Sequence, residues 1–67
     1  MISYDPLWKT MKEKGATTYT LRRKDKVGGS TMQRLQRGES VSTNTLDMLC
    51  KILNCKLCDI IEYVEDE

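Results

Sequence analysis

The residues best suited to chemistry lie in the stretch VGGSTMQRLQRG, residues 27–38, which contains Gln33 and Arg34. Amide and guanidinium groups form paired hydrogen bonds with planar partners such as carboxylates, phosphates and the edges of nucleobases. Met32 and Leu35 are three positions apart, which places both on one side of a helix. The stretch therefore predicts a short helix with one apolar face and one hydrogen-bonding face.

Catalytic chemistry finds little support in the rest of the chain. There is no histidine, the commonest general base, and Gly28 and Gly29 do not form a nucleotide-binding motif. A chain of 67 residues buries only about 60% of its unfolded surface, which leaves little room for a deep cleft. We expect a small binding module, not an enzyme, with no cofactor and no small-molecule substrate.

The three cysteines, Cys50, Cys55 and Cys58, form a C-x4-C-x2-C run. A structural zinc site needs four ligands, and the chain has neither a histidine nor a fourth cysteine to complete one. Cys50 also falls on an apolar helical stripe, where cysteine acts as a small hydrophobe. We therefore favour packing roles and no metal site, with Cys58 as the exposed thiol. A redox or metal role for Cys55 and Cys58 is the alternative.

Composition and charge favour a folded domain with two unlike ends. Apolar residues make up 39% of the chain, which is too many for an obligately disordered segment. No apolar run could span a membrane and no signal peptide is visible, so we expect a cytoplasmic protein with reduced cysteines. Residues 22–37 hold six basic side chains against one acidic, whereas residues 57–67 hold five acidic and no basic ones. The molecule should be polarised, although for the charge runs alone we favour the simpler interpretation of two solvated faces.

Start and stop signals predict five short helices. Asp5 followed by Pro6 is typical of a helix N-cap and first position, whereas Gly15 and Gly38 are typical left-handed ends. The predicted segments are about 6–14, 18–25 (capped by Thr17 or Thr18), 29–37, one from a cap at Ser42 or Thr43 to a stop at Asn54, and about 57–62.

The two ends of the chain allow two interpretations. Ile2 and Tyr4 alternate with polar residues, and so do Ile61 and Tyr63. Two short strands joining the termini would fit this pattern, but we favour frayed ends for segments this short.

The second and third segments together predict a helix-turn-helix. Four apolar positions would lock the pair: Leu21, Val27, Met32 and Leu35. A helix of about ten residues fits the DNA major groove, where arginine can bind guanine and glutamine can bind adenine through two hydrogen bonds.

With these motifs in place, the chain resembles the compact five-helix regulators of the phage Cro/repressor type, the XRE family, over about residues 5–62. The resemblance rests on Thr17-Thr18-x-x-Leu21, Val27, Ser30-Thr31-Met32-x-Arg34-Leu35-x-Arg37-Gly38, Ser42-x-x-Thr45-Leu46-x-x-Leu49-Cys50-x-x-Leu53-Asn54-Cys55 and Leu57-x-Asp59-Ile60. The two ends of the chain, Tyr4-Asp5-Pro6-Leu7-Trp8-Lys9 and Asp59-Ile60-Ile61-Glu62, also resemble the ends of the very short members of this family. The resemblance implies an all-α, lambda-repressor-like DNA-binding fold, and we expect one such domain over residues 1–67.

The resemblance also implies sequence-specific binding of double-stranded DNA by a homodimeric transcriptional regulator. The positions where the family reads bases are occupied here by Gly29, Ser30, Gln33 and Arg34. Those placed for backbone contacts are Thr18, Arg37, Ser40, Thr43 and Asn44, and the charges of Arg22 and Arg23 make them further backbone candidates. Candidates for the dimer surface are the exposed part of the fifth helix and Ile2, Tyr4, Tyr63 and Val64.

Five positions depart from the family pattern, and one of them is Asp25, which stands where the family has an apolar residue. Arg22 replaces a small residue, Lys26 replaces glycine in a left-handed turn at a cost of roughly 1 kcal/mol, and Gly28 replaces a Ser or Thr cap. Gly29 offers no side chain to a base. We therefore expect a loose second helix and weaker or narrower DNA readout, with Arg22 either directed to solvent or reaching a phosphate.

These departures favour a second hypothesis from a different class. The same fold could serve as a protein-interaction module, for instance an antitoxin-like or anti-repressor partner, with little affinity for DNA.

Overall fold

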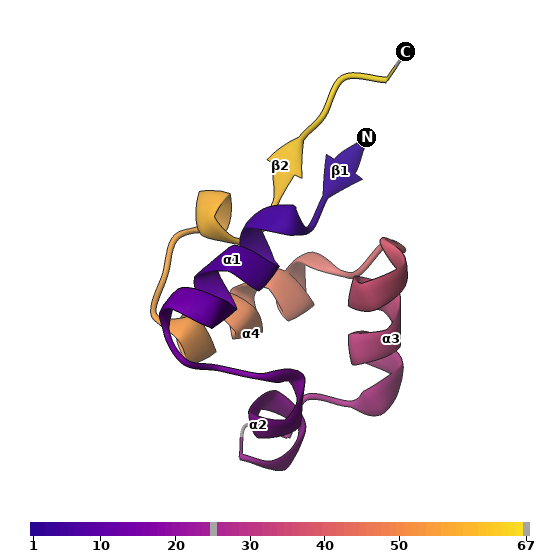
Figure 1. The fold of residues 1–67 in the computed structure, drawn as a ribbon. Helices are drawn as coiled ribbons and strands as arrows, with labels where there is room; N and C mark the ends of the chain where they lie inside the picture. The colour runs from indigo at the N-terminus through magenta and orange to yellow at the C-terminus, as the bar shows by residue number, and fades with distance from the viewer. Residues whose placement is uncertain (25, 67) are drawn as a thin grey trace.

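The computed structural model describes residues 1–24 and 26–66, which form four α-helices, one 3₁₀ turn and a two-stranded ribbon (Figure 1). The elements in chain order are β1 (Ile2–Ser3), α1 (Asp5–Glu13), α2 (Thr18–Arg23), α3 (Gly29–Arg37), α4 (Thr43–Leu53), η1 (Leu57–Asp59) and β2 (Glu62–Tyr63). The predicted, mainly helical architecture is confirmed.

Residues in the left-handed conformation end three of the helices, as predicted. Gly15, Gly38 and Asn54 have φ angles of 71°, 74° and 51°. After α3, the N–H of Gly38 donates to the carbonyl of Leu35 at 3.3 Å, and the N–H of Glu39 donates to the carbonyl of Arg34 at 2.8 Å. This pair of bonds is a Schellman motif, and it satisfies carbonyls that the helix end would otherwise leave open.

Hydroxyl side chains begin α2 and α4. Thr17 and Thr20 cap α2 reciprocally, each Oγ1 accepting the other residue's N–H, at 3.1 and 2.9 Å. The Oγ of Ser42 accepts the N–H of Thr45 at 3.2 Å, which places the start of α4 as expected.

The expected cap of α1 is wrong by one residue. Asp5 lies inside the first turn, after Tyr4, and its own N–H donates to the Oγ of Ser3 at 3.2 Å. Its carboxylate therefore faces the positive end of the helix dipole.

One apolar core joins all four helices. Leu7 of α1, Leu21 of α2, Leu35 of α3 and Leu49 of α4 are each at most 1% exposed. Trp8 is half-buried against this core. The remaining buried apolar residues are Tyr4, Met11, Val27, Met32, Leu53 and Ile60.

The termini pair with each other, so the expectation of frayed ends is wrong. β1 and β2 are antiparallel, with Ile2 opposite Tyr63 and Ser3 opposite Glu62. Beyond the strands, the N–H of Val64 donates to the carbonyl of Met1 at 2.8 Å. The ribbon projects beyond the helices (Figure 1), and the backbone bonds across it explain why so short a pair forms.

Two further expectations near the termini need correction. The predicted fifth helix shortens to the 3₁₀ turn η1, which the Oδ2 of Asp59 caps by accepting the N–H of Lys56 at 3.0 Å. Tyr4 is only 7% exposed, and its hydroxyl donates to the carbonyl of Glu39 at 2.7 Å. It therefore packs inside the fold and is not a candidate for a dimer contact, whereas Ile2, Tyr63 and Val64 are exposed.

The backbone is strained at Lys26, in the turn between α2 and α3. α2 ends at Arg23, two residues before the predicted end at Asp25, which lies outside the described residues. Lys26 then has a φ of 57°, the left-handed conformation expected at this position. The N–H of Val27 donates to the carbonyl of Leu21 at 2.9 Å, which closes the turn.

Replacing Lys26 with glycine should stabilise the fold by about 0.5–1 kcal/mol, because glycine adopts this backbone conformation without steric cost. The change would raise the melting temperature by several degrees, which thermal unfolding followed by circular dichroism can measure. Lys24→Gly is the matched control and should destabilise, because Lys24 has an ordinary right-handed φ of −80°. An unchanged or lower melting temperature in Lys26→Gly would refute the assigned strain.

Candidate nucleic-acid interface

Helix α3 has one buried face and one exposed face. Met32 and Leu35 are 3% and 1% exposed and hold the helix to the core. Gln33, Arg34 and Arg37 are exposed on the other sides. The predicted division of this helix between apolar and hydrogen-bonding residues is confirmed. α3 also lies at the edge of the molecule, and no other helix is drawn on its outer side (Figure 1).

The start of α3 is open. Gly28 occupies the N-cap position and provides no side-chain hydrogen bond to the first turn. Gly29 and Ser30 are exposed, as the predicted base-contact positions require. The free N–H groups and the helix dipole give this end a partial positive charge.

Arg22 of α2 reaches toward this open end. A Cβ atom at Gly29 would lie 3.4 Å from Nη2, 3.8 Å from Cζ and 3.9 Å from Nε of Arg22. The guanidinium therefore lies beside Gly29. Two departures from the family pattern are therefore neighbours in space: the large side chain of Arg22 on α2 faces Gly29 on α3.

The next arginine lies differently. The guanidinium carbon of Arg23 is 5.5 Å from the centre of the Tyr19 ring, at a distance typical of a cation–π contact within α2. Arg22 and Arg23 are both exposed, whereas Thr18 at the start of α2 is half-buried.

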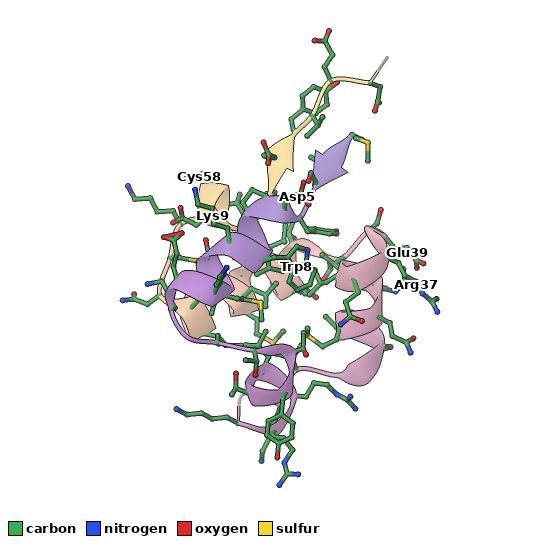
Figure 2. All side chains as sticks on the ribbon, viewed as in Figure 1. Asp5, Trp8, Lys9, Arg37, Glu39 and Cys58 are labelled. Carbon is green, nitrogen blue, oxygen red and sulfur yellow. The ribbon has the colours of Figure 1, made fainter. Side chains whose placement is uncertain are left out.

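The end of α3 holds a small charge cluster (Figure 2). Nη1 of Arg34 and Nη1 of Arg37 lie 3.7 and 3.9 Å from the two carboxylate oxygens of Glu39. Nη1 of Arg34 also donates to the carbonyl of Ser40 at 3.4 Å. Because all these side chains are exposed, each ion pair contributes at most about 1 kcal/mol. Glu39 nevertheless lowers the positive charge beside two predicted DNA contacts.

Sequence reasoning missed Glu39, although it stands directly after the predicted helix end at Gly38. The Schellman turn places a residue at this position close to the last turn of the helix. The other predicted backbone-contact residues in this region, Ser40, Thr43 and Asn44, are exposed in the loop after α3 and the first turn of α4.

Basic side chains are frequent around the start of α3, and carboxylates are frequent beside η1. Arg22, Lys24 and Lys26 are exposed in α2 and the turn before α3, next to the arginines of α3 itself. A groove between α1 and η1 is lined by Lys9 and by four carboxylates: Asp5, Glu13, Asp59 and Glu62. The basic segment before α3 is exposed as expected, but Lys9 lines the acidic groove and Glu39 lies beside Arg34 and Arg37, so the two signs of charge are not fully separated.

The cysteines have separate surroundings. Burial, together with the neighbouring Cys50 and Asp59, raises the pKa of the Cys55 thiol, although Lys14 opposes the shift. Cys58 is exposed and borders the groove beside α1, near Lys9 (Figure 2). Among residues 1–24 and 26–66, no group of three or more potential ligands is placed to hold a metal ion. Nor does any helix in these segments have the length and apolarity needed to cross a bilayer.

The model of the Cro/C1-type helix-turn-helix DNA-binding domain matches residues 6–66 of this chain. The chain belongs to this family. Among solved structures it is similar to the transcriptional regulator VanUg, with 35% sequence identity and a TM-score of 0.87. That similarity covers 97% of this chain and 87% of the VanUg chain. No curated protein matches the chain significantly. The predicted family and fold class are thereby confirmed.

The burial of the thiols leads to a prediction about their reactivity. A thiol reagent should react first with Cys58, because it is exposed, whereas Cys55 is partly buried and holds less thiolate at a given pH. The rate of reaction at Cys55 should keep rising with pH at values where the reaction rate of an ordinary thiol has already levelled off. Cys58→Ser should remove the fast phase of a disulfide-exchange assay and Cys55→Ser should keep it. Loss of the fast phase in Cys55→Ser would contradict this assignment.

Proposed function

We propose that this chain is a transcriptional regulator that binds a specific double-stranded DNA sequence, with α3 in the major groove. The observation that carries the proposal is the division of α3, in which Met32 and Leu35 are buried while Gln33, Arg34 and Arg37 are exposed. These polar side chains are of the types that bind adenine, guanine and phosphate. The description of VanUg as a transcriptional regulator supports a regulatory role.

The contacts divide into two groups by chemistry. Base edges would be read from Ser30, Gln33 and Arg34, with Gly29 allowing close approach at the start of the helix. Backbone phosphates would be held by the hydroxyl, amide and guanidinium groups around them: Thr18, Arg22, Arg23, Arg37, Ser40, Thr43 and Asn44. Phosphate contacts fix the position of the protein, and base contacts fix the sequence.

The regulator would act as a homodimer on a pseudo-palindromic site. Two recognition helices related by a two-fold axis reach half-sites about 34 Å apart, one turn of the duplex. Exposed apolar side chains at the terminal ribbon, Ile2, Tyr63 and Val64, are candidates for this contact.

The Glu39 carboxylate favours a second candidate function. Its position between Arg34 and Arg37 weakens the field that would attract DNA. The alternative is a protein-interaction module of the same fold, such as an antitoxin-like partner. A stable protein complex, together with no binding to any duplex, would select that alternative.

Salt dependence tests the proposed function directly. If each subunit of the dimer neutralises roughly four to six phosphates, the affinity of the dimer should fall about 10⁴–10⁶-fold between 50 and 200 mM salt. Fluorescence anisotropy with a duplex enriched from a random library would measure the slope. Failure to enrich any duplex, or an affinity that does not change with salt, would count against DNA binding.

Substitutions at the end of α3 should change DNA affinity in opposite directions. Arg34→Ala should cost about 1–3 kcal/mol of binding free energy and relax the preference at one base pair. Glu39→Gln should instead raise affinity about two- to five-fold at low salt, because it removes a carboxylate within 4 Å of both arginines.

Lys51→Ala is a matched control for Arg34→Ala, because each removes one positive charge, and Asp47→Asn is the matched control for Glu39→Gln, because each removes one negative charge. Lys51 is exposed on α4 and pairs with Asp47 at 3.2 Å, so its loss changes the net charge without touching α3. If Arg34→Ala lowers affinity no more than Lys51→Ala does, Arg34 has no specific contact. If Glu39→Gln leaves affinity unchanged or lowers it, the carboxylate does not oppose binding.

A further inference from the structure

Gly29 leaves a gap in the row of side chains along the outer face of α3. Gly29, Gln33 and Arg37 are four residues apart, so they lie one above another on the helix surface. Two of these positions carry long hydrogen-bonding side chains, whereas the first carries none. The first is also the position at the open end of the helix, where Gly28 provides no side-chain cap.

The guanidinium of Arg22 fills this gap from a different helix. The three heavy atoms nearest to the Cβ position of Gly29 are Nη2, Cζ and Nε of Arg22, at 3.4, 3.8 and 3.9 Å. Gly29 has no positive φ, so its backbone does not itself require glycine. A larger side chain at position 29 would instead compete with the guanidinium for this space.

We infer that Arg22 supplies from α2 the base-reading group that Gly29 lacks, and that it binds the O6 and N7 atoms of a guanine. The inference rests on the proposed function, and it assigns to Arg22 more than a contact with the DNA backbone. Positions 29 and 33 are separated by about 6 Å along the axis of α3, and the guanidinium lies beside the first of them. If Gln33 faces base edges in the major groove, this group faces those of a base pair close by.

The neighbouring arginine provides the contrast. The Arg23 guanidinium lies over the ring of Tyr19, within its own helix, and α3 provides none of that contact. Arg23 can attract the duplex through its charge, but it is not placed at the row formed by Gly29, Gln33 and Arg37. The two consecutive arginines should therefore have different roles. Loss of Arg22 should change which DNA sequence is bound, whereas loss of Arg23 should change only the affinity.

The test is selection from a randomised duplex library with the full chain and four variants: Arg22→Ala, Arg22→Lys, Arg23→Ala and the double variant Arg22→Ala with Gly29→Arg. Arg22→Ala should lose the preference for guanine at one position and bind the selected site about 5- to 150-fold more weakly. Arg22→Lys should lose the same preference, because an ammonium keeps the charge but not the paired donors. The double variant, which moves the guanidinium onto α3, should recover the preference.

The outcomes separate this inference from the proposed function. Arg23→Ala should weaken binding to all sequences similarly and leave the selected motif intact. If Arg22→Ala or Arg22→Lys also keeps the full motif, Arg22 contacts phosphate only and the inference is overturned, while DNA binding stands. If the unaltered chain selects no motif, both fail. Circular dichroism of each variant establishes that a lost preference does not come from unfolding.

Discussion

The fold depends above all on the burial of two side chains from one short helix. Met32 and Leu35 hold α3 against the core, where Leu21 and Val27 from the preceding segment are also buried. A nine-residue helix is marginal in water by itself, so this burial decides whether the helix exists and how it is rotated. A rotation that exposed Met32 would turn a polar neighbour, Gln33 in one direction or Thr31 in the other, toward the interior. Core packing and the orientation of the candidate DNA-binding face are therefore the same constraint.

The second constraint acts at the end of that helix. Gly38 and Glu39 close α3 through backbone hydrogen bonds, and the hydroxyl of Tyr4 binds the Glu39 carbonyl from the start of the chain. The loop that positions the Glu39 carboxylate is thus tied to both the helix and the terminal region. Such anchoring keeps a negative charge close to Arg34 and Arg37. If the chain binds DNA as proposed, this arrangement would lower its non-specific attraction to the phosphates and leave more of the binding free energy to base contacts.

The unusual residues at the start of α3 compensate for one another. Arg22 would crowd a larger residue at position 29, and Gly29 leaves the space that its guanidinium occupies. Taken separately in the sequence, both residues suggested a looser helix pair and a poorer interface. Because the two residues lie side by side, the Arg22 guanidinium stands at the positive N-terminal end of α3. A hydrogen-bond acceptor of DNA would be attracted both by this cation and by the helix dipole.

Local signals in the sequence were enough to predict most helices and the inward face of α3. Caps such as Ser42, stops such as Gly38 and the spacing of Met32 and Leu35 act within one or two helical turns, so they are readable along the chain. The burial of Tyr4, the pairing of the two termini and the place of the Arg22 guanidinium were decided only by the tertiary structure. Each depends on contact between residues that lie far apart in sequence or on different helices. Periodicity within a segment carries no information about such contacts, because they form only once packing brings the segments together.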